Sequence, residues 1–159
     1  MKDDTLIAIL AYNEQKNITN VLKDVSNSFN NILVVDNNSL DLTVQKVKEF
    51  PVYLIEHKYN LGKSDSMKTA LEFAKLKNFK YLAYMDADGQ HKTKDLVNIC
   101  EKIYNNKSQI VIGYRKELSN LNFQKKIGTI ILQFLFATLY KKKLYDIQSG
   151  LRVIDLAIE

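Results

Sequence analysis

The chain has 159 residues, which corresponds to one domain, since domains contain roughly 100 to 200 residues. Hydrophobic residues make up 46% and charged residues 26%, a globular composition that excludes disordered, collagen-like and coiled-coil proteins. The single cysteine, Cys100, excludes an internal disulfide framework and a cysteine zinc site. We therefore expect a single domain over residues 1–159 in a reducing, cytoplasmic compartment.

The formal net charge of +5 is unevenly distributed. Seven basic residues and only one acid, Glu117, lie between Arg115 and Tyr145. A segment of this kind attracts polyanions such as lipid headgroups, nucleotides or nucleic acid. A solvated helix end is the alternative interpretation.

Short apolar runs alternate along the chain with longer segments of helical period. In chain order, the pattern predicts a strand at 6–10, a helix at 18–25, a strand at 32–35, a helix at 41–50, a strand at 52–55, a helix at 67–76, a strand at 81–85, a helix at 96–103, a strand at 110–112 and a helix at 121–140. Parallel strands need crossover connections, and these are right-handed. The predicted class is therefore α/β, with a mostly parallel sheet between two layers of helices.

Polar residues follow three of the predicted strands, at 11–14, 36–39 and 86–91. In open sheets of this class, ligands bind at the carboxyl ends of the strands, so these loops converge on one site. If 86–88 is extended, Asp86 and Asp88 point to the same side and present two carboxylates to one cation. Such oxygen ligands suit magnesium, manganese or calcium. The glycine fingerprints of dinucleotide-binding and P-loop proteins are absent, so we expect a metal-bridged diphosphate.

Six motifs occur in order over nearly the whole chain. They are Ile9-Leu10-Ala11-Tyr12-Asn13-Glu14, Val34-Val35-Asp36-Asn37-Asn38-Ser39, Asn60-Leu61-Gly62-Lys63, Asp86-Ala87-Asp88-Gly89-Gln90-His91, Gly113-Tyr114-Arg115 and Asp146-Ile147-Gln148-Ser149-Gly150-Leu151-Arg152. Together they resemble glycosyltransferase family 2, and within it the polyprenyl-phosphate glycosyltransferases of the dolichyl-phosphate mannose synthase type. The resemblance implies a Rossmann-like GT-A fold and inverting transfer of a sugar from a GDP- or UDP-sugar, with Mg²⁺ or Mn²⁺.

The resemblance also implies roles for individual residues. Those expected to bind the nucleotide sugar are Ala11, Tyr12, Asn13, Glu14, Asp36, Asn38, Lys63, Asp86, Ala87, Asp88, Gln90 and Arg115. Asp36 matches the acid that contacts the base, and Asp86 and Asp88 match the metal ligands. Those expected to contact an acceptor phosphate are Lys125, Lys126 and Arg152.

The chemistry of transfer depends on the acceptor. A divalent cation, Arg115 and Lys63 would stabilise the negative charge that develops on the leaving diphosphate. A lipid phosphate is already an anion and needs no strong general base. A sugar hydroxyl needs a carboxylate to take its proton, and Asp146 is the candidate for that catalytic role beside Arg115.

The sequence departs from the family pattern at three places. Asn37 stands where a second acid is usual, which removes one expected carboxylate contact, and Asp65 would repel a diphosphate unless it points away. The chain ends at Glu159, so we expect it to lack the C-terminal part of the usual family domain. His57 is interpreted as a surface loop residue, and His91 as a residue beside the substrate.

The segment 121–140 has an apolar helical stripe with lysines at both ends. It is typical of an element that lies at a membrane interface and captures an acceptor, although a core helix or a dimer interface fits equally. Its most hydrophobic part is shorter than the roughly 20 residues that span a bilayer. We therefore expect peripheral contact with the cytoplasmic face of a membrane, whereas the oligomeric state is not predicted.

The leading hypothesis is an enzyme that transfers a sugar to a polyprenyl (dolichyl or undecaprenyl) phosphate. A glycan hydroxyl in cell-surface polysaccharide synthesis is the alternative acceptor, and a non-catalytic nucleotide-sugar-binding module is the alternative class. Nucleic-acid binding would explain the basic segment, but the acids at the strand ends would repel nucleic-acid phosphates unless a metal is present. We therefore expect no nucleic-acid partner.

Overall fold

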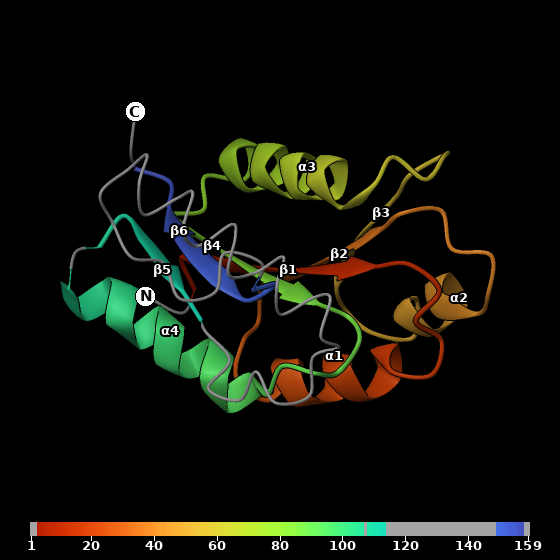
Figure 1. The fold of residues 1–159 in the computed structure, drawn as a ribbon, viewed down its shortest axis with the longest axis horizontal. Coiled ribbons are helices and arrows are strands. Elements are labelled where there is room, and N and C mark those ends of the chain that lie inside the picture. The colour runs from red at the N-terminus through yellow and green to blue at the C-terminus, as the bar shows by residue number, and fades with distance from the viewer. Residues whose placement is uncertain (1–2, 107, 114–148, 158–159) are drawn as a thin grey trace, which may run out of the picture.

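A computed structural model describes residues 3–106, 108–113 and 149–157 (Figure 1). Its strands are β1 (Thr5–Ala11), β2 (Ile32–Asp36), β3 (Tyr53–Glu56), β4 (Tyr81–Asp86), β5 (Ile110–Ile112) and β6 (Arg152–Asp155). Its helices are α1 (Ile18–Ser26), α2 (Thr43–Val47), α3 (Lys63–Leu76) and α4 (Thr93–Asn106). Helix α3 covers one face of the sheet, and α1, α2 and α4 lie on the other (Figure 1). The predicted three-layer α/β architecture is confirmed.

The strands form one sheet in the order β3-β2-β1-β4-β6-β5. Strand β1 pairs in parallel with β2 and β4, and β2 pairs in parallel with β3. Strand β6 lies antiparallel between β4 and β5. The sequence analysis did not predict β6, because its four residues are too few to show a two-residue period and its partners are distant in sequence.

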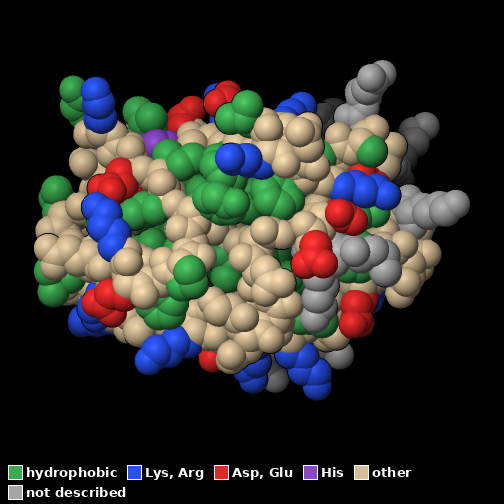
Figure 2. All heavy atoms as spheres, turned by 180° about the vertical axis from the view of Figure 1, so that it is seen from behind, with side chains coloured by type: hydrophobic (Ala, Val, Ile, Leu, Met, Phe, Trp, Pro, Cys, Tyr) green, Lys and Arg blue, Asp and Glu red, His purple; other side chains and the backbone are tan. Residues whose placement is uncertain are grey.

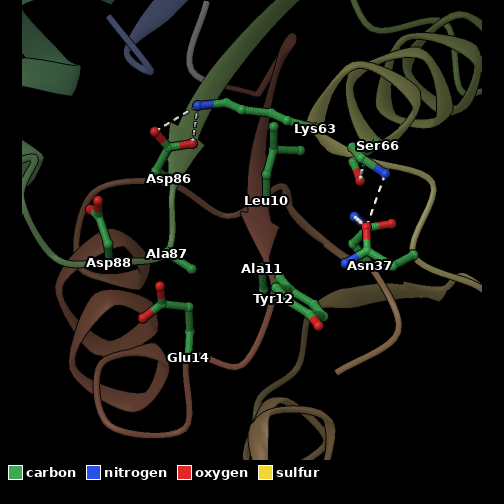
Figure 3. A pocket seen from close by; sticks show the side chains of 12 residues that line it. Leu10, Ala11, Tyr12, Glu14, Asn37, Lys63, Ser66, Asp86, Ala87 and Asp88 are labelled. Atoms are coloured by element: carbon green, nitrogen blue, oxygen red, sulfur yellow. Dashed lines mark hydrogen bonds and ion pairs between the residues drawn. The ribbon is translucent and has the colours of Figure 1, made fainter. Parts of the chain in front are cut away.

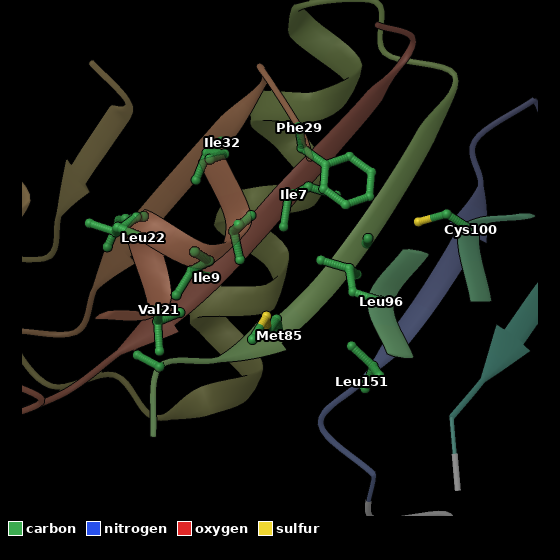
Figure 4. Packing of buried hydrophobic residues seen from close by; sticks show 14 of the residues in the cluster. Ile7, Ile9, Val21, Leu22, Phe29, Ile32, Met85, Leu96, Cys100 and Leu151 are labelled. Carbon is green, nitrogen blue, oxygen red and sulfur yellow. The ribbon is translucent and has the colours of Figure 1, made fainter. Parts of the chain in front are cut away.

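The two faces of the sheet pack into two hydrophobic clusters. All seven residues of β1 are buried, as expected of a strand with helices on both sides. Ile7 and Ile9 face α1 and α4, where they pack with Leu22 and Leu96 (Figure 4). The intervening residues face α3 and pack with its small buried residues. Packing on both faces therefore fixes the position of β1, including its last residue at the edge of the sheet.

The helices bury apolar residues at helical spacing. In α1, the four buried residues are Ile18, Val21, Leu22 and Val25. In α3, Ala70 and Ala74 are buried, whereas Leu76, the last residue of the helix, is 77% exposed. Helix α2 is shorter than the predicted 41–50. The expected helix at 121–140 lies outside the described residues.

The surface carries exposed hydrophobic side chains as well as charges. Hydrophobic side chains gather in the middle of the face shown in Figure 2, with charged side chains distributed around them. Within the described ranges, no helix has both the length and the apolar character needed to cross a membrane.

Hydrogen bonds join the loop after β1 to the loop after β2. The amide of Asn13 donates to Ser39 Oγ at 2.8 Å, and Asn13 Oδ1 accepts from the Leu40 amide at 2.8 Å. The amide of Glu14 donates to Thr43 Oγ1 at 2.8 Å. These bonds hold the ends of two strands together, although the loops are 26 to 29 residues apart in sequence.

Asp41 is the acceptor at the centre of this junction. Its carboxylate accepts from the Gln15 amide at 3.0 Å, from the Thr43 amide at 2.9 Å and from the Thr43 hydroxyl. Burial raises the pKa of the Asp41 carboxyl, but these hydrogen bonds outweigh it and hold the pKa below its usual value. Ionised Asp41 is therefore favoured by the folded state.

We expect Asp41→Ala to lower the free energy of unfolding at pH 7 by about 1 to 3 kcal/mol, because three donors lose their acceptor. A lowered pKa in the folded state stabilises above the usual pKa, and this stabilisation is lost as pH falls through the lowered value. The difference between wild type and variant should therefore shrink on acidification. Urea denaturation at pH 7 and pH 3 measures it. Glu72→Ala, which removes an exposed acid of α3, is the control, and a difference as large at pH 3 as at pH 7 would contradict the assignment.

Candidate functional site

A cavity of about 340 Å³ opens at the carboxyl ends of β1, β2 and β4 (Figure 3). It is lined by Leu10, Ala11, Tyr12, Glu14, Asn37, Asn60, Gly62, Lys63, Ser66, Asp86, Ala87 and Asp88. The parallel register explains why these residues meet, since Leu10 is opposite Asp86 and Ala11 is opposite Asp36. Of the predicted nucleotide-sugar residues, seven line the cavity: Ala11, Tyr12, Glu14, Lys63, Asp86, Ala87 and Asp88.

Other predicted residues lie beside the cavity without lining it. Asn13 and Asn38 have positive φ angles of 55° and 65°, which asparagine tolerates better than most residues. Asp36 is buried at the end of β2, and the amide of Gln90 donates to Asp88 Oδ1 at 2.9 Å. Contacts between these four residues and a ligand stay predictions.

Four predicted residues lie outside the described part of the chain: Arg115, Lys125, Lys126 and Asp146. The predicted acceptor residue Arg152 is described, but it does not line the cavity. Arg152 Nη2 donates to the Ser149 carbonyl at 2.7 Å, while its Nε is buried and has no partner in the described part of the chain. Arg152 is opposite Tyr84 in the sheet. Burial raises the pKa of the Tyr84 hydroxyl to about 12, and the charge of Arg152 acts in the opposite direction.

Asp86 and Asp88 both reach the cavity, but not for the predicted reason. Strand β4 ends at Asp86, and Ala87 and Asp88 form a turn, so the segment is not extended. Ala87 is buried, and its amide donates to the Leu10 carbonyl at 3.1 Å. This bond holds the turn against the end of β1, and the side chains of Asp86 and Asp88 both line the cavity (Figure 3).

Lys63 forms an ion pair with Asp86 through both carboxylate oxygens. Its Nζ lies 2.6 Å from Oδ1 and 2.7 Å from Oδ2 (Figure 3). Lys63 is the first residue of α3, after Gly62 with φ 85°. Asp65, whose charge could have repelled a diphosphate, has a side chain that is 45% exposed. It pairs with Lys68 at 3.4 Å and does not line the cavity.

Asn37 shapes the cavity in place of the expected second acid. Its Oδ1 accepts from the Leu61 amide at 3.0 Å, and its Nδ2 donates to Asn60 Oδ1 at 2.8 Å. The Gly62 amide also donates to Asn60 Oδ1, at 3.1 Å. A carboxylate could accept from Leu61 but could not donate to Asn60. The departure from the family pattern therefore serves the structure of the loop that precedes α3.

His57 belongs to the same network. It lies in the loop after β3, as predicted, but its side chain makes hydrogen bonds within the fold. Its Nδ1 lies 3.2 Å from Asn37 Oδ1, and its Nε2 lies 2.9 Å from Thr69 Oγ1 in α3. The side chain is half-buried. Sequence reasoning missed this role because nothing in the local pattern around His57 indicates contacts with residues 20 and 12 positions away.

The residues fit a divalent cation. Glu14, Asp86 and Asp88 supply carboxylate oxygens to the cavity. Across the described ranges, no three His, Cys, Asp or Glu side chains are close enough together to form a protein metal cage. A cation at Asp86 and Asp88 would therefore complete its coordination with water and ligand oxygens, as Mg²⁺ usually does.

Gly150 lies against the Asp86 carboxylate. A Cβ atom at Gly150 would lie 2.0 Å from Asp86 Oδ2, which is far inside van der Waals contact. The same segment is anchored by Ser149 and Leu151, which are buried. A side chain at position 150 can therefore be accommodated only if the carboxylate or the backbone moves.

We expect Gly150→Ala to lower the free energy of unfolding by about 1 to 3 kcal/mol, the usual cost of overpacking. Most of this loss should disappear in the background of Asp86→Ala, because the clash involves that carboxylate. A double-mutant cycle of urea unfolding measures the interaction. Strict additivity of the two substitutions would contradict it.

Comparisons with known proteins identify the family to which the chain belongs. Residues 6–155 match the family model described as "Glycosyl transferase family 2". An uncharacterized protein of Methanocaldococcus jannaschii is 36% identical, over 94% of this chain and 71% of that protein. The UDP-N-acetylglucosamine–dolichyl-phosphate N-acetylglucosaminyltransferase of Methanococcus voltae is 32% identical, over 98% of this chain and 71% of that protein.

The fold also matches a solved structure, glucosyl-3-phosphoglycerate synthase of Mycobacterium tuberculosis in complex with Mn²⁺, UDP-glucose and phosphoglyceric acid. The TM-score is 0.76 at 14% identity, over 95% of this chain and 56% of that chain. This likeness concerns the fold alone, and the chain spans little more than half of the solved protein. With the family model matched along residues 6–155, the chain belongs to glycosyl transferase family 2, as its motifs predicted.

Proposed function

We propose that this chain binds a GDP- or UDP-sugar with Mg²⁺ or Mn²⁺ and transfers the sugar, with inversion, to a polyprenyl phosphate. The observation that carries the proposal is the charge of the cavity. Three carboxylates line it, from Glu14, Asp86 and Asp88, against the single ammonium of Lys63 among the described residues. Two negative charges in excess would repel a diphosphate, so a divalent cation must accompany it.

The nucleobase would be held at the end of β2. Asp36 Oδ2 accepts from the Ser39 amide at 2.9 Å, whereas Oδ1 is buried and has no hydrogen-bond partner among the described residues. A buried acceptor without a donor is unfavourable by about 1 to 3 kcal/mol, which a ligand N–H would recover. Uracil and guanine both carry a ring N–H that can donate to a carboxylate. Asp36 therefore supports a uridine or guanosine nucleotide.

The diphosphate would lie toward Asp86, Asp88 and Lys63. The bound cation would act as a Lewis acid that stabilises the negative charge on the leaving nucleoside diphosphate. Asp86 and Asp88 would hold that cation, and the Lys63 ammonium would donate hydrogen bonds to phosphate oxygens. Arg115, as implied by the family motif, is proposed to add a second cation there.

The acceptor is proposed from the Methanococcus voltae relative, whose name specifies dolichyl phosphate. A lipid phosphate is anionic at neutral pH, so it can attack the sugar without a strong general base. Inversion requires the acceptor to approach opposite the leaving diphosphate. Lys125, Lys126 and Arg152 are the proposed contacts with its phosphate, and the acceptor would bring the protein to the cytoplasmic face of a membrane.

We expect Asp88→Ala to weaken the binding of UDP or GDP in the presence of Mn²⁺ by about 10- to 100-fold, since charged contacts contribute about 1.5 to 3 kcal/mol. The substitution removes no core packing, so the urea midpoint should stay unchanged. Calorimetric titration of both nucleotides, with and without Mn²⁺, measures the effect. Asp95→Ala, which removes an acid of α4 that does not line the cavity, serves as the control.

Unchanged nucleotide affinity in Asp88→Ala would contradict the proposed metal site. The transfer step is tested separately with the nucleotide sugar that binds and with dolichyl phosphate and undecaprenyl phosphate in detergent micelles. Formation of a glycosylated lipid phosphate supports the proposal. Donor binding without transfer to either lipid would contradict the proposed acceptor.

A further inference from the structure

We infer that Lys63 is a tethered cation that occupies the Asp86 carboxylate when no ligand is bound and transfers to the diphosphate when a divalent cation replaces it. The metal and the nucleotide would then bind cooperatively. This inference rests on the proposed function, because it requires Asp86 to be a metal ligand.

The first step of the argument is the geometry of the ion pair. Lys63 Nζ is within 2.7 Å of both oxygens of Asp86, so one ammonium occupies the whole face of the carboxylate that it contacts. Gly150 lies against the same carboxylate, and there is no room between them even for a methyl group. The carboxylate therefore cannot turn freely to offer a cation another face.

The second step is competition between like charges. A divalent cation binds carboxylate oxygens at roughly 2.0 to 2.6 Å, depending on the metal. If Lys63 kept both of its contacts, the metal and the ammonium would share the same two oxygens at a few ångströms' separation. Their mutual repulsion would oppose this arrangement. Metal binding at Asp86 therefore favours release of Lys63.

The third step is that Lys63 is able to move. Its side chain is 48% exposed, and it begins α3 directly after Gly62, so no preceding helical turn packs against it. The lysine side chain carries its ammonium on a flexible stem of four carbons. Release of the ammonium thus requires side-chain rotation only, and no rearrangement of the sheet.

The fourth step is the destination of the ammonium. Among the described residues, no other Lys or Arg lines the cavity, so Lys63 is the basic group placed to meet a phosphate there. A divalent cation at Asp86 and Asp88 would neutralise both carboxylates. Lys63 would then be released from its carboxylate partner beside the site that the diphosphate occupies, and each ligand would favour the binding of the other.

Thermodynamic linkage makes this cooperativity reciprocal. If Mn²⁺ tightens nucleotide binding by a given factor, the nucleotide tightens Mn²⁺ binding by the same factor. Part of that factor comes from the direct contact between metal and phosphate. The remainder comes from Lys63, and removing the lysine separates the two parts.

The test is Mn²⁺ titration of wild type and Lys63→Met, first with no nucleotide. Without its competitor, Asp86 should bind Mn²⁺ about two- to fivefold more tightly, in line with the strength of a partly exposed ion pair. UDP or GDP should then bind to the Mn²⁺-saturated variant at least about tenfold more weakly than to wild type, since a charged contact is lost. Electron paramagnetic resonance of free Mn²⁺ and calorimetry provide readouts that do not depend on turnover.

Lys68→Met is the matched control, because Lys68 lies on the same helix and pairs with Asp65 away from the cavity. It should change neither affinity. Equal or weaker Mn²⁺ binding by Lys63→Met would overturn the inference. Asp86→Ala tests the proposed metal site separately from the role of Lys63. If this substitution leaves Mn²⁺ affinity unchanged, the metal site is contradicted. If Mn²⁺ binding is lost, the metal site is supported independently of the result for Lys63→Met.

Discussion

The parallel register of β1 with β2 and β4 is the constraint on which the site depends. It places Ala11 opposite Asp36 and Leu10 opposite Asp86, so that three loops leave the sheet at one edge. The register is fixed by burial on both faces of β1, because a slip by one residue would exchange the side chains that face α3 with those that face α1 and α4. The hydrophobic core thus determines where the carboxylates lie.

Carboxylates gathered in this way repel one another, and the surrounding groups offset that repulsion differently at each position. Asp41 is satisfied by amide and hydroxyl donors, Asp86 by the Lys63 ammonium and Asp88 by the Gln90 amide. Asp36 keeps one buried oxygen for which the described ranges offer no partner. The acids that hold the loops together are therefore saturated by fixed donors. Asp86, which is proposed to bind a cation, has a removable partner, and Asp36, which is proposed to bind the base, has an unused acceptor.

The sequence predicted the layers of this fold well, because strands buried on both faces appear as continuous apolar runs between amphipathic helices. It could not predict β6, whose place between β4 and β5 depends on pairing with residues far away in sequence. The same limit applies to the site. Asp86, Asp88 and Lys63 could be predicted from motifs, but their pairing could not. Asn37 and His57 contribute through long-range hydrogen bonds that leave no local signal.

The position of Gly150 shows why β6 matters to the site. Strand β6 is hydrogen-bonded to β4, and the residues just before it bring a glycine against the carboxylate that ends β4. Asp86 is thereby confined by a backbone contact from Gly150 and by the two-oxygen ion pair with Lys63. Of these two restraints, the backbone contact cannot leave without disturbing the sheet, whereas the lysine can. A group held rigidly by one partner and reversibly by another is already oriented when a ligand arrives, so the exchange of cations requires little reorganisation of the protein.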